Sequence, residues 1–94
     1  MADFYPCILI PVYRHGRACE KVVNSITQYN LPIILVDDGN ESETKAYLSK
    51  IKENHNSVEL VTLPKNQGKG GAFKAGVIRA KELGFSHILQ LDAD

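Results

Sequence analysis

Two short acidic segments are the features of this sequence that could do chemistry. Residues 37–39 (Asp-Asp-Gly) and 92–94 (Asp-Ala-Asp) each come directly after an apolar run. Carboxylates this close to apolar segments need a cation or hydrogen-bond donors, because a buried charge without a partner is costly. Asp92 and Asp94 are two residues apart, so in extended backbone both side chains project to the same face. They could share one metal ion.

The type of metal site follows from the small number of carboxylates. Mg²⁺ and Mn²⁺ are commonly bound through one or two carboxylates, several waters and phosphate oxygens of the substrate. An acidic pair without a complete protein cage therefore indicates a metal–diphosphate complex. The alternative is a surface turn at 92–94 and a turn with a positive-φ glycine at 37–39. Both segments at one sheet edge would favour the metal site.

The elements that must position these residues alternate between strands and helices. Short apolar or β-branched runs predict strands, and apolar residues at steps of three and four predict helices. The predicted strands are 7–12, 31–36, 58–63 and 87–91, and the predicted helices are 17–29, 44–53 and 72–83, the last with Gly84 as a left-handed cap. This order predicts an α/β fold with three layers, a mainly parallel sheet of about four strands and helical crossovers. Ligands bind at the carboxyl edge of such sheets, where both acidic segments are expected.

The segment 68–71 (Gly-Lys-Gly-Gly) lies just before the third predicted helix. It matches neither the P-loop pattern nor the dinucleotide fingerprint. The glycines and Lys69 could let an anion approach backbone N–H groups, or they could serve a loop and close helix packing. The sequence leaves both alternatives open.

Length, charge and cysteine spacing narrow the function classes. The chain has 94 residues, enough for one domain, and 11 Lys and Arg balance 11 Asp and Glu. No broad positive field results, so no nucleic-acid partner is expected. The sequence has no apolar stretch of membrane-spanning length and no signal-peptide pattern, which predicts a cytoplasmic location. Cys7 and Cys19 have no metal or redox spacing and are predicted to be reduced packing residues.

Four segments together resemble the inverting glycosyltransferases of family 2, which have the GT-A nucleotide-sugar fold. They are 10–13 (Ile-Pro-Val-Tyr), 36–39 (Val-Asp-Asp-Gly), 66–72 (Asn-Gln-Gly-Lys-Gly-Gly-Ala) and 91–94 (Leu-Asp-Ala-Asp). The form of residues 90–94 is most similar to the polyprenyl-phosphate (dolichyl-phosphate) mannosyltransferase branch. The resemblance implies that residues 1–94 are the Rossmann-like, donor-binding N-terminal part of a GT-A domain, truncated at the Asp-x-Asp motif. No catalytic residue is assigned within the chain, because the general base is expected beyond Asp94.

The resemblance also implies a set of binding residues. Those for the nucleotide sugar are Pro11, Tyr13, Val36, Asp38, Lys69, Asp92 and Ala93, and those for Mg²⁺ or Mn²⁺ are Asp92 and Asp94. Pro11 and Tyr13 would line the nucleotide pocket with Val36 packing nearby, and Asp38 would accept hydrogen bonds from the base. Arg14 and Asn40 stand where the family often has Asn and Ser, which leaves the donor open.

The implied reaction is transfer of a sugar, with inversion, from a UDP- or GDP-sugar to an acceptor oxygen. The acceptor would be a saccharide or a polyprenyl phosphate, the latter placing the full-length protein at the inner face of the membrane. This fragment would supply donor and metal binding without turning over alone. It would also self-associate through the sheet edge at 88–91, since an unpaired apolar edge promotes pairing.

Two other functions are compatible with parts of the pattern. A sugar nucleotidylyltransferase uses a related sheet and an acidic metal site, but it should have a Gly-rich loop directly after the first strand, where residues 13–16 read Tyr-Arg-His-Gly. A non-catalytic nucleotide-binding module is the other alternative. The transferase interpretation requires Asp38 and Asp92 to lie on the same side of the molecule.

Overall fold

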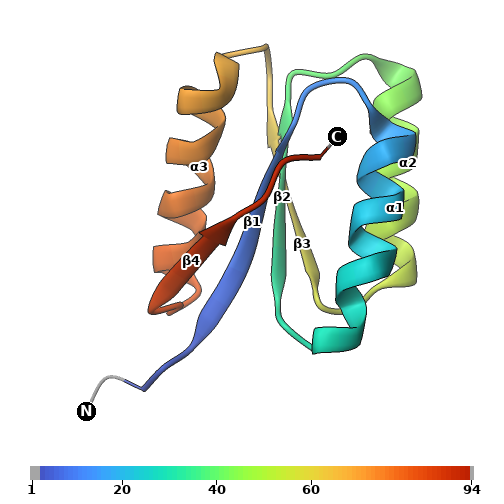
Figure 1. Cartoon of the computed structure of the whole chain (residues 1–94). Helices are drawn as coiled ribbons and strands as arrows, with labels where there is room; N and C mark the ends of the chain where they lie inside the picture. Colours follow the sequence, from blue (N-terminus) through green and yellow to red (C-terminus); the bar gives the residue numbers. More distant parts are fainter. Residues whose placement is uncertain (1–2, 94) are drawn as a thin grey trace.

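The chain forms one parallel sheet with helical crossovers (Figure 1). The computed structural model describes residues 3–93. Along the chain the elements are β1 (Pro6–Val12), α1 (Gly16–Ile26), the 3-10 turn η1 (Thr27–Tyr29), β2 (Ile33–Asp38), α2 (Ser42–Asn54), β3 (Val58–Leu63), α3 (Gly68–Glu82) and β4 (His87–Gln90). The strand order is β3-β2-β1-β4, and every neighbouring pair is parallel. The predicted α/β class is confirmed.

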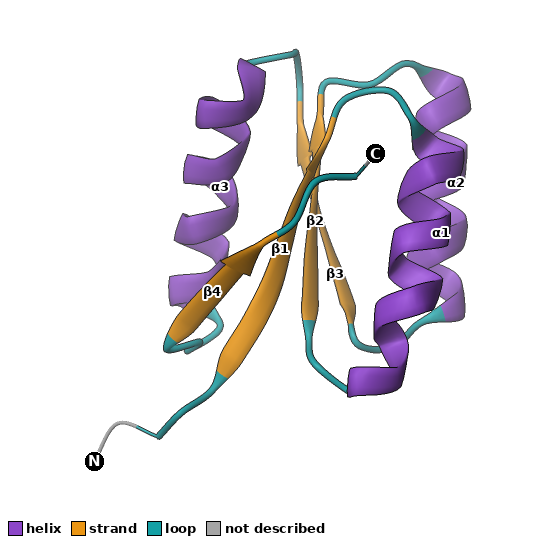
Figure 2. Cartoon of the chain, viewed as in Figure 1, coloured by secondary structure: helices purple, strands orange, loops and turns teal. Residues whose placement is uncertain are grey.

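Helices cover both faces of the sheet, so the molecule has three layers. α3 lies on one face, and α1 and α2 lie on the other (Figure 2). Side chains alternate along β1: Ile8 and Ile10 pack against α1 and α2, whereas Cys7 and Leu9 pack against α3. Burial on both faces explains why β1 and β2 are continuous apolar runs rather than alternating ones.

The second strand is longer at its carboxyl end than the sequence predicted. β2 ends at Asp38, and the two aspartates pair with Thr62 and Leu63 of β3. The prediction ended this strand at residue 36, because charged residues are usually excluded from buried strands. Here both carboxylates have hydrogen-bond partners that allow burial. The acidic pair is therefore held by regular sheet structure and not by a loop.

The third helix starts earlier than predicted, because the glycines of 68–71 form its first turn and not a preceding loop. At Gly76 the helix approaches the sheet so closely that a Cβ would overlap Leu9 and meet Val36. The predicted left-handed cap is confirmed at Gly84, where φ is 84° and the N–H group donates to the Lys81 carbonyl.

The cysteines, the free edge of β4 and the lengths of the helices complete the description of the scaffold. Cys7 and Cys19 are free and buried, which confirms their packing role. Within residues 3–93, β4 pairs with β1 alone and Leu89 is 56% exposed, so self-association through this edge stays a prediction. None of the helices in the described part of the chain is long and apolar enough to cross a bilayer.

Candidate functional site

A pocket of about 300 Å³ lies at the carboxyl edge of the sheet. Its lining comes from the ends of β1 and β2, from the segment after β4 and from the start of α3: Pro11, Val12, Tyr13, His15, Asp38, Asn66, Gly68, Lys69, Asp92 and Ala93. Because β2, β1 and β4 are adjacent in the sheet, their carboxyl ends are adjacent too. Asp38 and Asp92 therefore lie on the same side of the molecule, as the transferase interpretation requires.

Most of the residues predicted to bind the donor come together in this pocket. Six of the seven line it, and the exception is Val36. Val36 is fully buried in the apolar layer between the sheet and α3, next to Gly76. Val36 lies two residues before the end of β2, paired with Pro11 of β1, and its side chain packs in the core under α3. Asp94, the second predicted metal ligand, lies outside the described residues.

Asp38 is buried, yet its carboxylate has well-placed donors. It is 2% exposed and accepts hydrogen bonds from Asn66 Nδ2 at 3.0 Å and from the Gln67 N–H group at 2.7 Å. Asn66 Nδ2 also reaches the Asp38 carbonyl at 3.2 Å. These bonds fasten the loop before α3 to the end of β2. A carboxylate has about four acceptor positions, so Asp38 can still accept bonds from a ligand in the pocket.

Asp37 has a different set of partners. It is 2% exposed; its Oδ2 is 2.7 Å from Lys45 Nζ, and its Oδ1 accepts bonds from the Asn40 backbone N–H at 2.9 Å and from Asn40 Nδ2 at 2.7 Å. It does not line the pocket that Asp38 lines. Asp37 thus stabilises the connection between β2 and α2. The sequence alone did not distinguish this role from that of Asp38.

Asp92 and Lys69 form an ion pair across the mouth of the pocket. Lys69 Nζ is 2.9 Å from Asp92 Oδ1, and the side chains are 64% and 58% exposed. The carboxylate of Asp92 is therefore already paired with one positive charge, that of the Lys69 ammonium group. Within residues 3–93, no three His, Cys, Asp or Glu residues lie close enough together to hold a metal ion. Asp92, the one predicted metal ligand among the described residues, fits an Mg²⁺ or Mn²⁺ ion that takes most of its ligands from water and phosphate, as such ions commonly do.

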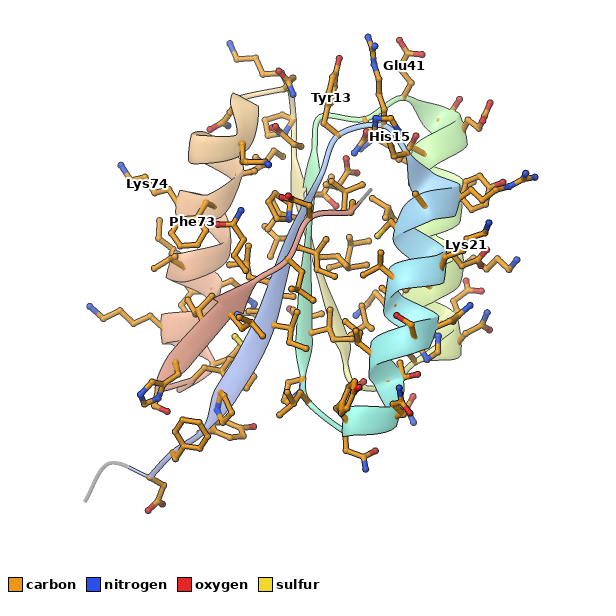
Figure 3. The ribbon with its side chains drawn as sticks, viewed as in Figure 1. Tyr13, His15, Lys21, Glu41, Phe73 and Lys74 are labelled. Atoms are coloured by element: carbon orange, nitrogen blue, oxygen red, sulfur yellow. The ribbon has the colours of Figure 1, made fainter. Side chains whose placement is uncertain are left out.

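The loop between β1 and α1 carries Tyr13 to the pocket in an unusual conformation. Arg14 and His15 have φ of 64° and 58°, in the left-handed region, which costs roughly 1–2 kcal/mol for each such residue. Arg14 Cζ lies 5.0 Å from the centre of the Tyr13 ring. Tyr13 is 44% exposed, and Figure 3 shows it beside His15 and Glu41 at the same end of the molecule.

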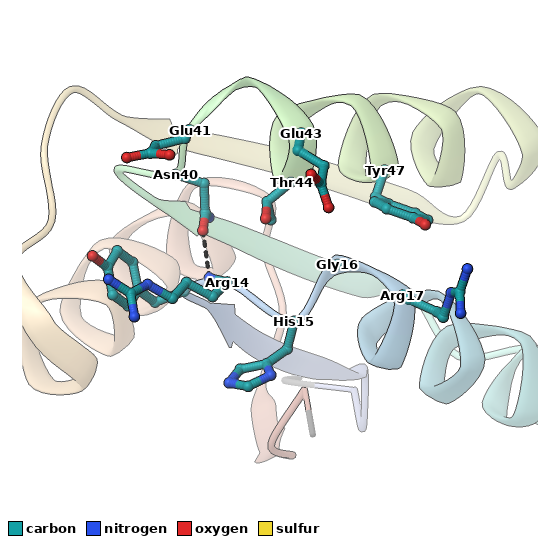
Figure 4. A pocket seen from close by; sticks show the side chains of 10 residues that line it. Arg14, His15, Gly16, Arg17, Asn40, Glu41, Glu43, Thr44 and Tyr47 are labelled. Atoms are coloured by element: carbon teal, nitrogen blue, oxygen red, sulfur yellow. Dashed lines mark hydrogen bonds between the residues drawn. The ribbon is translucent and has the colours of Figure 1, made fainter.

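A second pocket, of about 500 Å³, lies on the other side of this loop. It lies at the starts of α1 and α2, and Figure 4 shows Arg17 pointing toward Tyr47 of α2, whereas the Arg14 side chain runs away from α2, toward the Tyr13 ring. Tyr13 and His15 line both pockets, so the loop is the wall between them. The lining of this second pocket mixes arginines with Glu41 and Glu43, so it has no dominant charge.

Three residues to which the sequence patterns assigned no role hold parts of the first pocket in place. Asn66 and Gln67 hold Asp38, and Asn40 holds the loop that carries Tyr13. Asn66 and Gln67 lie within the segment 66–72 that carries the resemblance, and Asn40 directly follows the segment 36–39. Asn40 and Asn66 donate to the aspartates through their side-chain amides, which is a usable sequence signal, whereas Gln67 donates through its backbone N–H and leaves no such signal.

Comparison with known proteins agrees with this geometry. Residues 7–94 match Glycosyl transferase family 2. The chain belongs to that family. The match begins in β1 and covers every element after it, including the pocket residues at all three strand ends. The matched family consists of glycosyl transferases, which transfer a sugar and not a nucleotidyl group, so the nucleotidylyltransferase alternative is not supported.

Two curated relatives are identical to the chain at about a third or less of the aligned positions. A dolichyl-phosphate beta-glucosyltransferase of Trichomonas vaginalis is 27% identical over 99% of this chain and 31% of its own length. The UDP-N-acetylglucosamine--dolichyl-phosphate N-acetylglucosaminyltransferase of Methanococcus voltae is 32% identical over the whole chain and 43% of its own length. The chain therefore spans less than half the length of these relatives.

A solved structure supports the fold. The mannosyltransferase of Pyrobaculum calidifontis, in complex with GDP-Man and Mn²⁺, superimposes with a TM-score of 0.78 at 18% identity. The match covers 96% of this chain and 27% of the solved one. The predicted GT-A architecture is thereby confirmed for the family 2 chain.

Proposed function

We propose that this family 2 chain binds a nucleoside-diphosphate sugar and a divalent ion in the pocket at the carboxyl edge of its sheet. One observation carries the proposal: Asp38 at the end of β2 and Asp92 after β4 line the same pocket, together with Tyr13 and Lys69. The P. calidifontis structure contains GDP-Man and Mn²⁺, which makes a nucleotide sugar and a metal the natural ligands to test.

The nucleoside is proposed to lie between the ends of β1 and β2. Pro11 and the ring of Tyr13 give this part of the pocket an apolar surface. The buried carboxylate of Asp38 faces the same space and can accept hydrogen bonds from N–H groups of a base such as uracil or guanine. Val36 supports the site only from behind, through the core.

The diphosphate is proposed to lie between Asp92 and the start of α3. Asp92 and Asp94 would hold Mg²⁺ or Mn²⁺, with Ala93 beside the nucleotide sugar, and the bound ion would supply positive charge where the leaving diphosphate becomes more negative. Lys69 Nζ is already within 2.9 Å of Asp92 and would contact the same phosphate oxygens. The start of α3 also lies at the pocket, and helix N-termini favour anions.

The overall reaction would transfer the sugar to an acceptor oxygen with inversion. The oxygen attacks the anomeric carbon opposite the diphosphate, and the bond to the diphosphate breaks. A hydroxyl acceptor would give its proton to a general base or to water, whereas a phosphate acceptor would attack as an oxyanion. The names of the T. vaginalis and M. voltae relatives favour a polyprenyl phosphate as acceptor and hence work at a membrane surface. A Staphylococcus aureus relative, 28% identical over 92% of this chain, is a poly-beta-1,6-N-acetyl-D-glucosamine synthase and favours a saccharide instead.

Calorimetry with a panel of UDP- and GDP-sugars tests the proposed donor site. With Mn²⁺ present we expect binding of at least one nucleotide sugar, and Asp92→Ala should abolish it. Glu82→Ala is the matched control, because Glu82 also sits in an ion pair, has the same 58% side-chain exposure and lies at the far end of α3. Binding that does not depend on Mn²⁺, or equal loss in both variants, would contradict the proposal.

A further inference from the structure

We propose that Asn40 is a positioning residue, which locks the loop between β1 and α1 and thereby fixes Tyr13 at the wall of the donor pocket. The proposal rests on the proposed function for its ligand. Asn40 does not line the donor pocket, so it would act through the loop and not by touching the nucleotide.

The contacts of Asn40 span two strand ends. Its Nδ2 donates to the Val12 carbonyl at 2.8 Å and to Asp37 Oδ1 at 2.7 Å. Its Oδ1 accepts the backbone N–H of Arg14, the bond drawn in Figure 4. The side chain is thus bonded to the residues on both sides of Tyr13 and is anchored to the end of β2. A hydroxyl has one donor hydrogen, so among short side chains an amide is needed to donate two bonds and accept a third.

The hydrogen bonds of Asn40 are shielded from water. Asn40 is 6% exposed and Asp37 is 2% exposed, so water cannot easily replace the amide. Asp37 is itself held by Lys45, through its other oxygen. Asn40 bonds Asp37 Oδ1 twice, from its backbone N–H and from Nδ2, so its attachment to the end of β2 does not require Lys45, which binds the other oxygen.

The loop needs such an anchor because of its backbone. Arg14 and His15 are consecutive residues with positive φ, a backbone conformation that residues other than glycine rarely adopt. Such residues persist only where surrounding contacts hold them. The bonds of Asn40 to Val12 and Arg14 lie directly beside the strained pair. Without these two bonds we expect the loop to relax, and Tyr13, which lies between Val12 and Arg14, to move away from the pocket wall.

Amide hydrogen exchange and calorimetry together test this role. In Asn40→Ala we expect the Arg14 amide to exchange at least about tenfold faster and trypsin to cleave faster after Arg14, since one protecting bond is lost. Affinity for the nucleotide sugar with Mn²⁺ should fall about tenfold, the value of one well-placed hydrogen bond. If Asn40→Ala does not fold, Asn40→Ser keeps a hydroxyl that is too short to span both strand ends and should show a smaller effect in the same direction.

Lys45→Met is the matched control. It removes the other partner of Asp37 and should destabilise the fold, but it leaves all contacts of Asn40 in place. We expect Arg14 exchange to be unchanged and nucleotide affinity to stay within about twofold. A residue with a merely structural role would make the two variants behave alike, and that result overturns the proposal.

Two further results are decisive. Unchanged Arg14 exchange in Asn40→Ala overturns the lock, and faster exchange with unchanged affinity overturns its importance for the donor. If the unmutated chain binds no nucleotide sugar, the proposed function fails, whereas the exchange measurement still decides whether Asn40 holds the loop.

Discussion

Asp37 and Asp38 are neighbours in the sequence, but their carboxylates face opposite sides of the sheet. Asp37 bonds Lys45 and Asn40 on the side of α1 and α2, and Asp38 bonds the Asn66–Gln67 segment before α3. The cause is the alternation of side chains along a strand, since β2 continues through both residues. Asp38 lines the donor pocket, whereas Asp37 acts on it only indirectly, through Asn40 and the loop that Asn40 holds.

The first prediction uses this pair. Asp38→Asn replaces an acceptor oxygen by an NH₂ group, which must then face either Asn66 or the Gln67 N–H group. We expect unfolding free energy to fall by about 1–3 kcal/mol, because buried donors lose their partner. We also expect nucleotide-sugar affinity to fall at least about tenfold, measured by calorimetry with Mn²⁺, because a base N–H group loses its acceptor.

Asp37→Asn provides the comparison. It keeps Oδ1 for Asn40 and loses the ion pair with Lys45, so stability should fall while nucleotide affinity remains within about twofold. Equal loss of affinity in the two variants would show that the pocket does not distinguish the two carboxylates.

The second prediction concerns Lys69. Its ion pair with Asp92 is largely exposed, so removing it should change stability by less than about 1 kcal/mol. Lys69→Met should weaken nucleotide-sugar binding, because a cation near the diphosphate is lost, and strengthen binding of Mn²⁺ alone by a few-fold, because Asp92 loses its competing cation. Titrations of both ligands into both proteins give the four affinities. Parallel changes for Mn²⁺ and the nucleotide sugar would contradict the assigned role.

Much of the fold was predictable because it depends on patterns spread over many residues. The apolar runs that became β1 and β3, and the stripes that became α1 and α2, are long enough to determine the element type. The ends were less predictable. The charge at residue 37 predicts that the strand stops there. It continues because Asn40 and Lys45 bond Asp37, and because Asn66 and Gln67 bond Asp38.

The candidate site was predictable to the extent that the resemblance marked strand ends, and the parallel sheet brought those ends together. Contacts between loops could not be predicted, since they depend on side-chain direction. Arg14 and Asn40, the two departures from the usual family residues, lie 26 positions apart yet hydrogen-bond to each other. Val36 shows the opposite case: a residue beside the acidic pair in sequence that points into the core.

The third prediction tests the approach of two loops at Gly39. Its φ is 68°, and a Cβ there would overlap the backbone of Lys65 and Asn66. Gly39→Ala should therefore cost more than about 2 kcal/mol of unfolding free energy, from backbone strain and from displacement of the loop that holds Asp38. Gly70→Ala is the matched control, because nothing lies within 4 Å of its Cβ position. It should be neutral or stabilise by about 0.4–1 kcal/mol in the first turn of α3. Urea unfolding measures both, and similar costs would contradict the close approach at Gly39.

The fourth prediction concerns pH. Burial raises the pKa of the Cys19 thiol from 9.0 to about 12, and the charge of Glu20 acts in the same direction. In the unfolded chain this thiol ionises near its ordinary pKa, so between pH 9 and about 12 the folded state binds more protons than the unfolded one. Unfolding free energy should therefore fall as pH rises through this window, by up to about 1.4 kcal/mol per pH unit from this group. Below pH 9 the contribution is fully present.

Comparison with Cys19→Ala isolates this contribution from the lysines and tyrosines that titrate in the same range. Urea unfolding under reducing conditions from pH 8 to pH 10.5 should give a steeper decline for the unmutated protein than for Cys19→Ala, with a difference that grows above pH 9. Cys7→Ala is the second comparison: burial also raises the pKa of Cys7, so its removal should flatten the decline in the same direction. Parallel curves for the unmutated protein and Cys19→Ala would show that this thiol ionises as easily in the folded state as in the unfolded chain, and hence that α1 does not shield it.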